Sequence, residues 1–235
     1  MYYYGQSGQD SIIRQFFKSI NIEKGVFVDV GALDGVKMSN TYLLESEDKW
    51  AGICIEAHPD YGVKLKKNRK CKTFVCAAGD RNNIKCKFRA NYIGSLSTLN
   101  FDIAKNNFAS GVWGKAYCAD KETKKIHGYT NGTIEVTMRT IDSIIEDCKF
   151  EKVNFLTIDI DGSEIYAFKK CSLDRWQPEL LCLEHTILPN EISKFASDYG
   201  YYFARKIGAD SLFVKDTRHI EIIQKLQIKG VSKFN

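Results

Sequence analysis

The sequence predicts an α/β fold built on a mostly parallel β-sheet. Three stretches carry this prediction, because each is a short apolar run that ends in acidic residues: positions 26–35, 50–56 and 153–164. Apolar runs of this length are typical of strands buried on both faces of a parallel sheet. Open α/β sheets bind ligands beyond the carboxyl ends of their strands, so the acids mark the edge where we expect a functional site.

The first stretch predicts a strand over residues 26–30, a tight turn at Gly31 and then a helix that carries Tyr42 and Leu43. Glycine permits the sharp turn and leaves room for a ligand beside the backbone. A dinucleotide site requires Gly-x-Gly-x-x-Gly to hold a pyrophosphate, but Leu33 stands at the second glycine position. The turn therefore argues against a dehydrogenase and favours an adenosine ligand without phosphates, of which S-adenosylmethionine is the usual one.

The second stretch predicts a strand that ends in Glu56, 27 positions after Asp29. A carboxylate at this place can accept hydrogen bonds from both hydroxyls of a ribose. We therefore expect Glu56 to bind the ribose of the cofactor. Pro59 suits the first turn of a helix that follows and reaches about residue 68.

Several sequence blocks, in their order and spacing, resemble the FkbM family of S-adenosylmethionine-dependent methyltransferases, most of which methylate oxygen. The blocks are Gly-Gln-Asp at 8–10, residues 27–35, residues 39–45, residues 54–59, Thr-Ile-Asp at 140–142, Asp-Ile-Asp-Gly-Ser-Glu at 159–164 and Glu-His at 184–185. The chain departs from the family at Asp161, where glutamate is more frequent. The resemblance implies one domain over residues 1–235, with a Rossmann-like class I methyltransferase fold and a seven-stranded, mostly parallel sheet that has an antiparallel edge.

Near the N-terminus, Ser7 and Asp10 indicate the start of a helix. The resemblance implies that Gln9, in the same turn, also touches the methionine end of the cofactor, whereas capping alone would explain these residues equally well. At the first strand, we expect Asp29, Gly31 and Asp34 to shape the turn that holds the cofactor.

The third strand is expected over residues 73–77, with its turn at Ala78, Gly79 and Asp80. In methyltransferases of this fold, that turn lies along the adenine ring. The small side chain of Ala78 leaves a slot for the ring, and the carboxylate of Asp80 can accept from the exocyclic amine. The alternative for Asp80 is an ordinary turn residue.

Residues 84–89 and 134–139 alternate between apolar and polar side chains, which predicts two half-exposed strands. We expect them to pair with each other as an addition to the parallel sheet. The segment between them, residues 91–132, is too long for an ordinary loop and is typical of a lid or binding segment. Its aromatic and hydroxyl side chains suit a sugar, and Tyr92, Ser95 and Trp113 are the candidate substrate residues; the alternative is surface packing of an insertion.

The third acidic stretch places Asp159 and Asp161 at the end of a buried strand, which should neighbour the first strand if the strand order switches there. We expect Asp159 to hold the amino group of the cofactor or a metal ion, and Asp161 to take the proton from an acceptor hydroxyl. Glu164 is more simply explained as a helix cap. The next strand, over residues 180–184, ends in Glu184 and His185.

His185 is an alternative base, because neutral imidazole can accept a hydroxyl proton near pH 7. Asp159, Asp161, Glu184 and His185 are also possible ligands of a divalent metal ion, and the sequence leaves open whether such an ion binds. After these strands, residues 201–207 and 211–214 predict an antiparallel hairpin at one edge of the sheet. A final helix is expected from Arg218, followed by a frayed tail.

The net charge of +5 is modest and fits a lysine-rich solvated surface. No basic run interleaved with aromatic residues is present, so a nucleic-acid partner is not expected. An RNA ribose methyltransferase would need a Lys-Asp-Lys-Glu set, for which no lysine can be assigned beside the acid. A non-catalytic module that binds S-adenosylmethionine would be expected to lack the acids at 159 and 161 or His185. A carbohydrate acceptor is therefore the favoured partner.

The eight cysteines include no Cys-x-x-Cys pair, and several fall in expected buried strands, so we interpret them as free thiols. The sequence has no apolar run of membrane-spanning length and no secretory signal at its start. Together these features predict a cytoplasmic protein.

Overall fold

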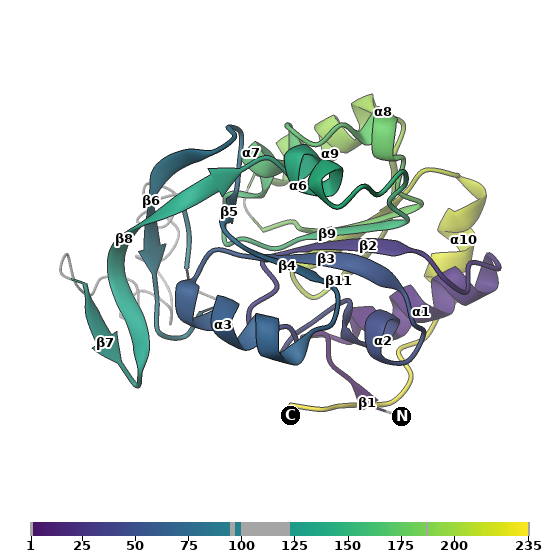
Figure 1. The fold of residues 1–235 in the computed structure, drawn as a ribbon. Coiled ribbons are helices and arrows are strands. Elements are labelled where there is room, and N and C mark those ends of the chain that lie inside the picture. Colours follow the sequence, from purple (N-terminus) through teal and green to yellow (C-terminus); the bar gives the residue numbers. More distant parts are fainter. Residues whose placement is uncertain (1, 95–96, 100–122, 187, 235) are drawn as a thin grey trace.

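A seven-stranded sheet lies between two layers of helices in the computed structural model, which describes residues 2–94, 97–99, 123–186 and 188–234 (Figure 1). The strand order is β11-β12-β10-β9-β2-β3-β4. The strands are β2 (Val26–Val30), β3 (Ala51–Glu56), β4 (Lys72–Val75), β9 (Phe155–Ile158), β10 (Leu180–Glu184), β11 (Tyr202–Ile207) and β12 (Asp210–Val214).

The strand order reverses at β2. This strand pairs in parallel with β3 on one side and with β9 on the other. This confirms the prediction that the strands of the first and third acidic stretches lie next to each other. The pairs β3–β4 and β9–β10 are also parallel. The hairpin β11–β12 runs antiparallel and joins β10 through β12, which confirms the expected antiparallel edge.

Each face of the sheet is covered by four helices among the described residues (Figure 1). One layer holds α6 (Ile141–Asp147), α7 (Glu164–Phe168), α8 (Leu173–Trp176) and α9 (Pro189–Asp198). The other holds α1 (Gln9–Ser19), α2 (Tyr42–Ser46), α3 (Pro59–Asn68) and α10 (Arg218–Lys225). Side chains of a strand alternate between faces: Val28 and Val30 pack under the first layer, and Phe27 packs under the second.

A second, separate sheet lies to one side of the first (Figure 1). It contains β5 (Ala77–Ala78), β6 (Ile84–Ala90), β7 (Lys124–Ile126) and β8 (Tyr129–Arg139). The expected pairing of β6 with β8 is confirmed, but the expectation that they extend the parallel sheet is wrong. The reason lies at Cys76, where the chain leaves β4 before the expected end of the strand and pairs Ala77 with Met138 instead.

The second sheet has a small core of its own, in which Phe88, Ala90, Val136 and Met138 pack against Ala77. These residues occupy one face of β6 and β8, as their alternation requires.

At the other end of the molecule, β1 (Tyr2–Tyr3) pairs in parallel with β13 (Val231–Ser232). The tail therefore forms a strand pair where a frayed end was expected.

In the described part of the chain, no helix is both long enough and apolar enough to cross a bilayer. The seven cysteines that fall within it are free thiols, in agreement with the interpretation from the sequence.

Candidate active site

A cavity opens at the carboxyl ends of β2, β3 and β9, where the acids of the sequence were expected to gather. The second sheet and the segment after β6 form its other wall. From the main sheet and its turns, the lining includes Gly31, Leu33, Ile55, Glu56, Asp159 and Asp161. From the second sheet and residues 97–99, it includes Ala77, Ala78, Phe88, Ser97, Thr98 and Leu99.

Gly31 shapes the floor of the cavity through a backbone contact. A β-carbon built at Gly31 would lie 1.8 Å from the carbonyl oxygen of Asp159, and the residue has φ 90°. The backbone amides of Gly31 and Ala32 both donate to the carbonyl oxygen of Ile55, at 2.9 and 3.1 Å. A glycine is thus required because the ends of β2 and β9 meet here, in addition to the room that it leaves for a ligand.

Glu56 lies at the end of β3 with its carboxylate held in place by the backbone. Its Oε2 accepts a hydrogen bond from the amide of Leu33 at 2.8 Å, and its Oε1 accepts one from the amide of His58 at 2.7 Å. The side chain is only 5% exposed, and this burial raises the pKa of Glu56 to about 7. Each carboxylate oxygen can accept a further hydrogen bond, so the expected contact with two ribose hydroxyls remains possible.

Three carboxylates meet beside the cavity: one oxygen each of Asp159, Glu164 and Glu184 lie within 4.8 Å of one another. Glu164 is the first residue of α7 and does not cap the helix; its Oε1 instead accepts from the amides of Ile160 and Gly162, at 2.9 and 3.0 Å, in the turn before α7. It also completes the cluster, in the place that the sequence analysis had given to Asp161 and His185.

The negative charge of the three carboxylates is poorly compensated within the described part of the chain. Burial, and after it the charge of Glu184, raises the pKa of both Asp159 and Glu164. The Oε2 atom of Glu184 is buried and has no hydrogen-bond partner among the described residues. Hard oxygen donors in this arrangement suit a divalent cation or a positively charged group of a ligand.

Asp161 also lines the cavity, and its backbone is left-handed, with φ 50°. Its carbonyl oxygen accepts a hydrogen bond from the hydroxyl of Thr98 at 2.8 Å. Burial and then the charge of Glu184 raise the pKa of Asp161. A carboxylate with a raised pKa that faces a cavity is a candidate acid or base.

His185 lies apart from the residues that line the cavity. Its Nδ1 is 2.9 Å from the hydroxyl of Ser211, and its Nε2 is 2.8 Å from the carbonyl oxygen of Pro189 and 2.9 Å from the hydroxyl of Ser193. Its ring packs edge-on against Phe213. Both nitrogens therefore have partners on β12 and α9, and the structure does not bring His185 into the carboxylate cluster.

Gln9 and Asp29 are both buried. The amide of Gln9 donates from Nε2 to Asp210 at 2.7 Å. The carboxylate of Asp29 accepts a hydrogen bond from the hydroxyl of Thr41 at 2.5 Å. Neither side chain is among those that line the cavity.

Asp34 and Asp80 are turn residues in this structure. The Oδ1 of Asp34 accepts from the amides of Val36 and Lys37, at 2.9 and 2.8 Å. Asp80 is exposed and forms an ion pair with Arg81 at 3.5 Å. Both lie outside the cavity lining, whereas Ala78, at the end of β5 and two residues before Asp80, is part of it.

Of the candidate substrate residues, Tyr92 accepts a hydrogen bond at its carbonyl oxygen from the hydroxyl of Tyr61 at 3.1 Å and does not line the cavity. Ser95 and Trp113 lie outside the described residues. Phe88 and Thr98 line the cavity but were not singled out from the sequence, although Thr98 lies in the segment 91–132 that was expected to bind substrate. The alternation of β6 gives a signal for Phe88, because it lies on the apolar face of that strand, but no local pattern marks Thr98.

Methyltransferases are among the solved structures that match this chain. One is the methyltransferase FkbM from Methylobacillus flagellatus, with 18% sequence identity and a TM-score of 0.51, over 82% of this chain and 44% of that one. This chain thus spans less than half of that protein's length. Another is a TehB-like SAM-dependent methyltransferase from Corynebacterium glutamicum, with 8% identity and a TM-score of 0.42, over 90% of this chain and 89% of that one. No curated protein matches the sequence.

The match to a protein family is more specific than the similarity to these solved structures. The family described as the methyltransferase FkbM domain matches residues 29–230. The matched region contains the whole seven-stranded sheet except the first residues of β2, together with the second sheet and the three acids of the cluster. The chain belongs to the FkbM methyltransferase family.

Proposed function

We propose that this chain is an S-adenosylmethionine-dependent O-methyltransferase of class I fold that methylates a sugar hydroxyl of a glycan or a glycosylated metabolite. The observation that carries the proposal is the single cavity edge on which Glu56, Asp159 and Asp161 meet. A ribose acceptor and a group of carboxylates on one edge suit a ligand that has both an adenosine part and positive charges.

In this proposal, different residues of the cavity bind different parts of the cofactor. Glu56 accepts the ribose hydroxyls, the apolar wall of Ala78 and Phe88 holds the adenine, and Asp159 receives the amino group. Gln9, Asp29 and Asp34 act in support, because their side chains fix the turns around the cavity. The contact between Asp80 and the adenine amine stays a prediction.

Bound S-adenosylmethionine supplies the electrophilic methyl group on its sulfonium. The chain must hold the acceptor oxygen in line with that group and exclude water. A sugar hydroxyl has a high pKa, so its proton leaves late, and we assign Asp161 as the group that takes it. His185 is the alternative base, and it would first have to release its partners at Ser211 or at Pro189.

The carboxylate cluster offers a second route to the same product. A divalent ion held by Asp159, Glu164 and Glu184 would lower the pKa of a bound sugar hydroxyl. The three carboxylates fit such an ion, since their oxygens converge within 4.8 Å and one oxygen of Glu184 has no partner in the described part of the chain. Asp161 and His185 were also metal candidates from the sequence, but they are not in this cluster.

The carbohydrate acceptor rests on the residue types of the segment 91–132, including Tyr92, Ser95 and Trp113, and stays a proposal, as does a cytoplasmic location. Two other functions compete with it. RNA ribose methylation uses the same cofactor with a basic binding face, and a non-catalytic module would bind S-adenosylmethionine without transfer. The acids that line the cavity favour an enzyme over a binding module.

The test is methyl transfer from labelled S-adenosylmethionine to a panel of mono- and oligosaccharides, with RNA as the competing acceptor. Calorimetry with S-adenosylhomocysteine measures cofactor binding separately. We expect binding and transfer to at least one sugar. Transfer to RNA and to no sugar would replace the glycan proposal, and binding without any transfer would support the non-catalytic module.

A further inference from the structure

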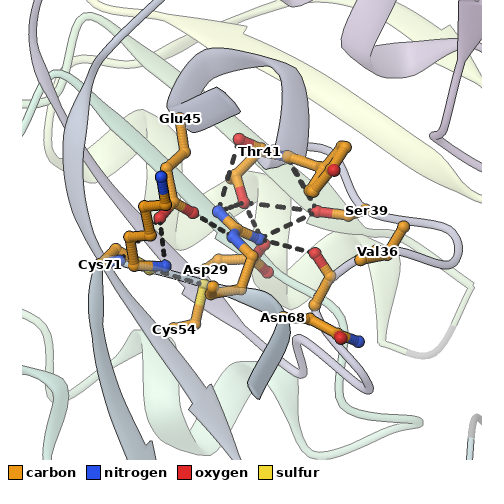
Figure 2. Close-up of polar contacts among 12 residues, drawn as sticks. Asp29, Val36, Ser39, Thr41, Glu45, Cys54, Asn68 and Cys71 are labelled. Carbon is orange, nitrogen blue, oxygen red and sulfur yellow. Dashed lines mark hydrogen bonds and ion pairs between the residues drawn. The ribbon is translucent and has the colours of Figure 1, made fainter. Parts of the chain in front are cut away.

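Arg69 is a buried cation that the proposed reaction does not use. It follows α3 directly and is only 5% exposed. A guanidinium has five N–H donors in a rigid, planar arrangement. Figure 2 shows the acceptors that surround this group, among them Ser39, Thr41 and Glu45.

The acceptors of Arg69 all belong to one loop and the start of the helix after it. Its Nη1 donates to the carbonyl oxygen of Gly35 at 3.0 Å and to the hydroxyl of Ser39 at 3.4 Å. Its Nη2 donates to the hydroxyl and the carbonyl oxygen of Thr41, at 3.0 and 3.5 Å. Its Nε forms an ion pair with Glu45 of α2. One side chain thus holds residues 35–45 in a fixed shape.

The same loop begins at the turn that lines the cavity, with Gly31 and Leu33. Thr41 connects the loop back to the preceding strand, because its hydroxyl donates to the Oδ2 of Asp29 at 2.5 Å (Figure 2). Asp29 is only 6% exposed, and burial raises its pKa while the charge of Arg69 opposes that rise. Arg69 and Thr41 therefore clamp the two ends of the cofactor turn to each other.

We infer that Arg69 is a positioning residue for the cofactor: it fixes residues 31–41 so that Gly31, Leu33 and the Leu33 amide bound to Glu56 face the ligand. The inference rests on the proposed binding of S-adenosylmethionine in this cavity. A lysine cannot replace Arg69, because an ammonium is a point charge with three donors and cannot reach this set of acceptors together. The rings of Phe27 and Tyr42, at 5.3 and 5.9 Å, further restrict the position of the guanidinium.

The test compares Arg69→Lys with Arg14→Lys. Arg14 is also buried and is held by a carboxylate, donating to both oxygens of Asp48 at 2.6 and 2.7 Å, but its hydrogen bonds and ion pairs go to Asp48 and Glu47 and not to residues 31–41. Calorimetry with S-adenosylhomocysteine gives Kd, thermal denaturation gives Tm, and steady-state assays separate the KM for S-adenosylmethionine from kcat. Both substitutions should lower Tm.

Only Arg69→Lys should raise Kd and KM, on the order of tenfold, while kcat at saturating cofactor stays within about twofold. A folded Arg69→Lys protein with the wild-type Kd would overturn the inference, and so would an equal rise in Kd in Arg14→Lys. Failure of the wild type to bind S-adenosylhomocysteine would instead refute the proposed function itself.

If Arg69→Lys does not fold, Thr41→Val decides, because it keeps Arg69 and removes the hydroxyl between Arg69 and Asp29. Thr41→Ser keeps that hydroxyl. We expect a raised Kd in the valine variant and its recovery in the serine variant. A wild-type Kd in Thr41→Val would overturn the inference.

Discussion

The hydroxyl of Thr98 donates a hydrogen bond to the carbonyl oxygen of Asp161 at 2.8 Å. The same hydroxyl is 3.4 Å from that of Ser163. Thr98 belongs to the segment that follows β6, and its backbone pairs with Arg89 of that strand through two hydrogen bonds, at 2.9 and 3.0 Å. The second sheet is therefore connected directly to the turn that carries the proposed base.

Thr98→Val should lower kcat by about tenfold or more, because the valine keeps the shape of the side chain but cannot hold the left-handed turn at Asp161, and small displacements of a reacting group are costly. The Kd for S-adenosylhomocysteine should change by less than about threefold. Thr98→Ser keeps the hydroxyl and is the matched control, expected near wild-type kcat. A wild-type kcat in Thr98→Val would show that the hydrogen bond does not position the acid.

Gly31→Ala should destabilise the fold by about 1–3 kcal/mol, as other overpacked sites do, and weaken cofactor binding. The new β-carbon would collide with the carbonyl oxygen of Asp159 and would also force an unfavourable φ. Gly128→Ala is the control, because Gly128 has φ 83° and a β-carbon there would meet nothing within 4 Å. Denaturant unfolding of both variants isolates the collision, and equal losses of stability would contradict the backbone contact.

The affinity for S-adenosylhomocysteine should fall as the pH is lowered through about 7. The pKa of Glu56 is raised to about 7 by burial, and only the ionised carboxylate can accept hydrogen bonds from both ribose hydroxyls. Binding therefore competes with protonation, with a loss of up to about tenfold per pH unit below the pKa. Above that pH, the ionisation of Glu56 should no longer change the affinity.

Calorimetry from pH 5.5 to about 8.5 on wild type and Glu56→Gln measures this dependence. Asp159 and Asp161 also have raised pKa values, so the part due to Glu56 is the difference between the two proteins. Glu221→Gln, an exposed substitution on α10 beside Lys225, should follow the wild type. If the Glu56→Gln protein had the wild-type affinity and the wild-type pH curve, Glu56 would not be the residue that binds the ribose.

The main sheet could be predicted from the sequence because its signals are local. Buried parallel strands form uninterrupted apolar runs, and the acids that follow β2, β3 and β9 mark one edge. The second sheet was misplaced because the residues of β4 and β5 form one apolar run, and only the pairing of Ala77 with Met138 decides where the chain leaves the first sheet.

The site could be predicted less well, because the direction of a side chain depends on strand parity. Glu184 and His185 are neighbours in sequence, but consecutive side chains point to opposite sides, so Glu184 reaches the cluster and His185 reaches Ser211. Asp29 likewise points away from the cavity that Val30 lines. Glu164 joins Glu184 only through the packing of two separate strands and a helix, which no local pattern reveals.

Asp161→Asn should lower kcat by about 10²–10⁴ while the Kd for S-adenosylhomocysteine is kept, as expected when a general base is removed. Burial raises the pKa of Asp161, so the carboxylate is available as a base only after it loses its proton, and kcat of the wild type should rise with pH. The rise should be absent in Asp161→Asn. His185→Gln should change kcat less than Asp161→Asn, and the opposite order would assign the base to His185.

The activity of the wild type should survive dialysis against a chelator if Asp161 alone takes the proton. Asp159, Glu164 and Glu184 lie together without any need for an ion in that case, because the raised pKa values of Asp159 and Glu164 favour their protonated forms, which relieves the repulsion. Activity that is lost with the chelator and restored by Mg²⁺ would instead establish the metal route. Glu164→Gln would then raise the Mg²⁺ concentration needed for half-maximal activity, whereas Glu221→Gln on the exposed face of α10 would not.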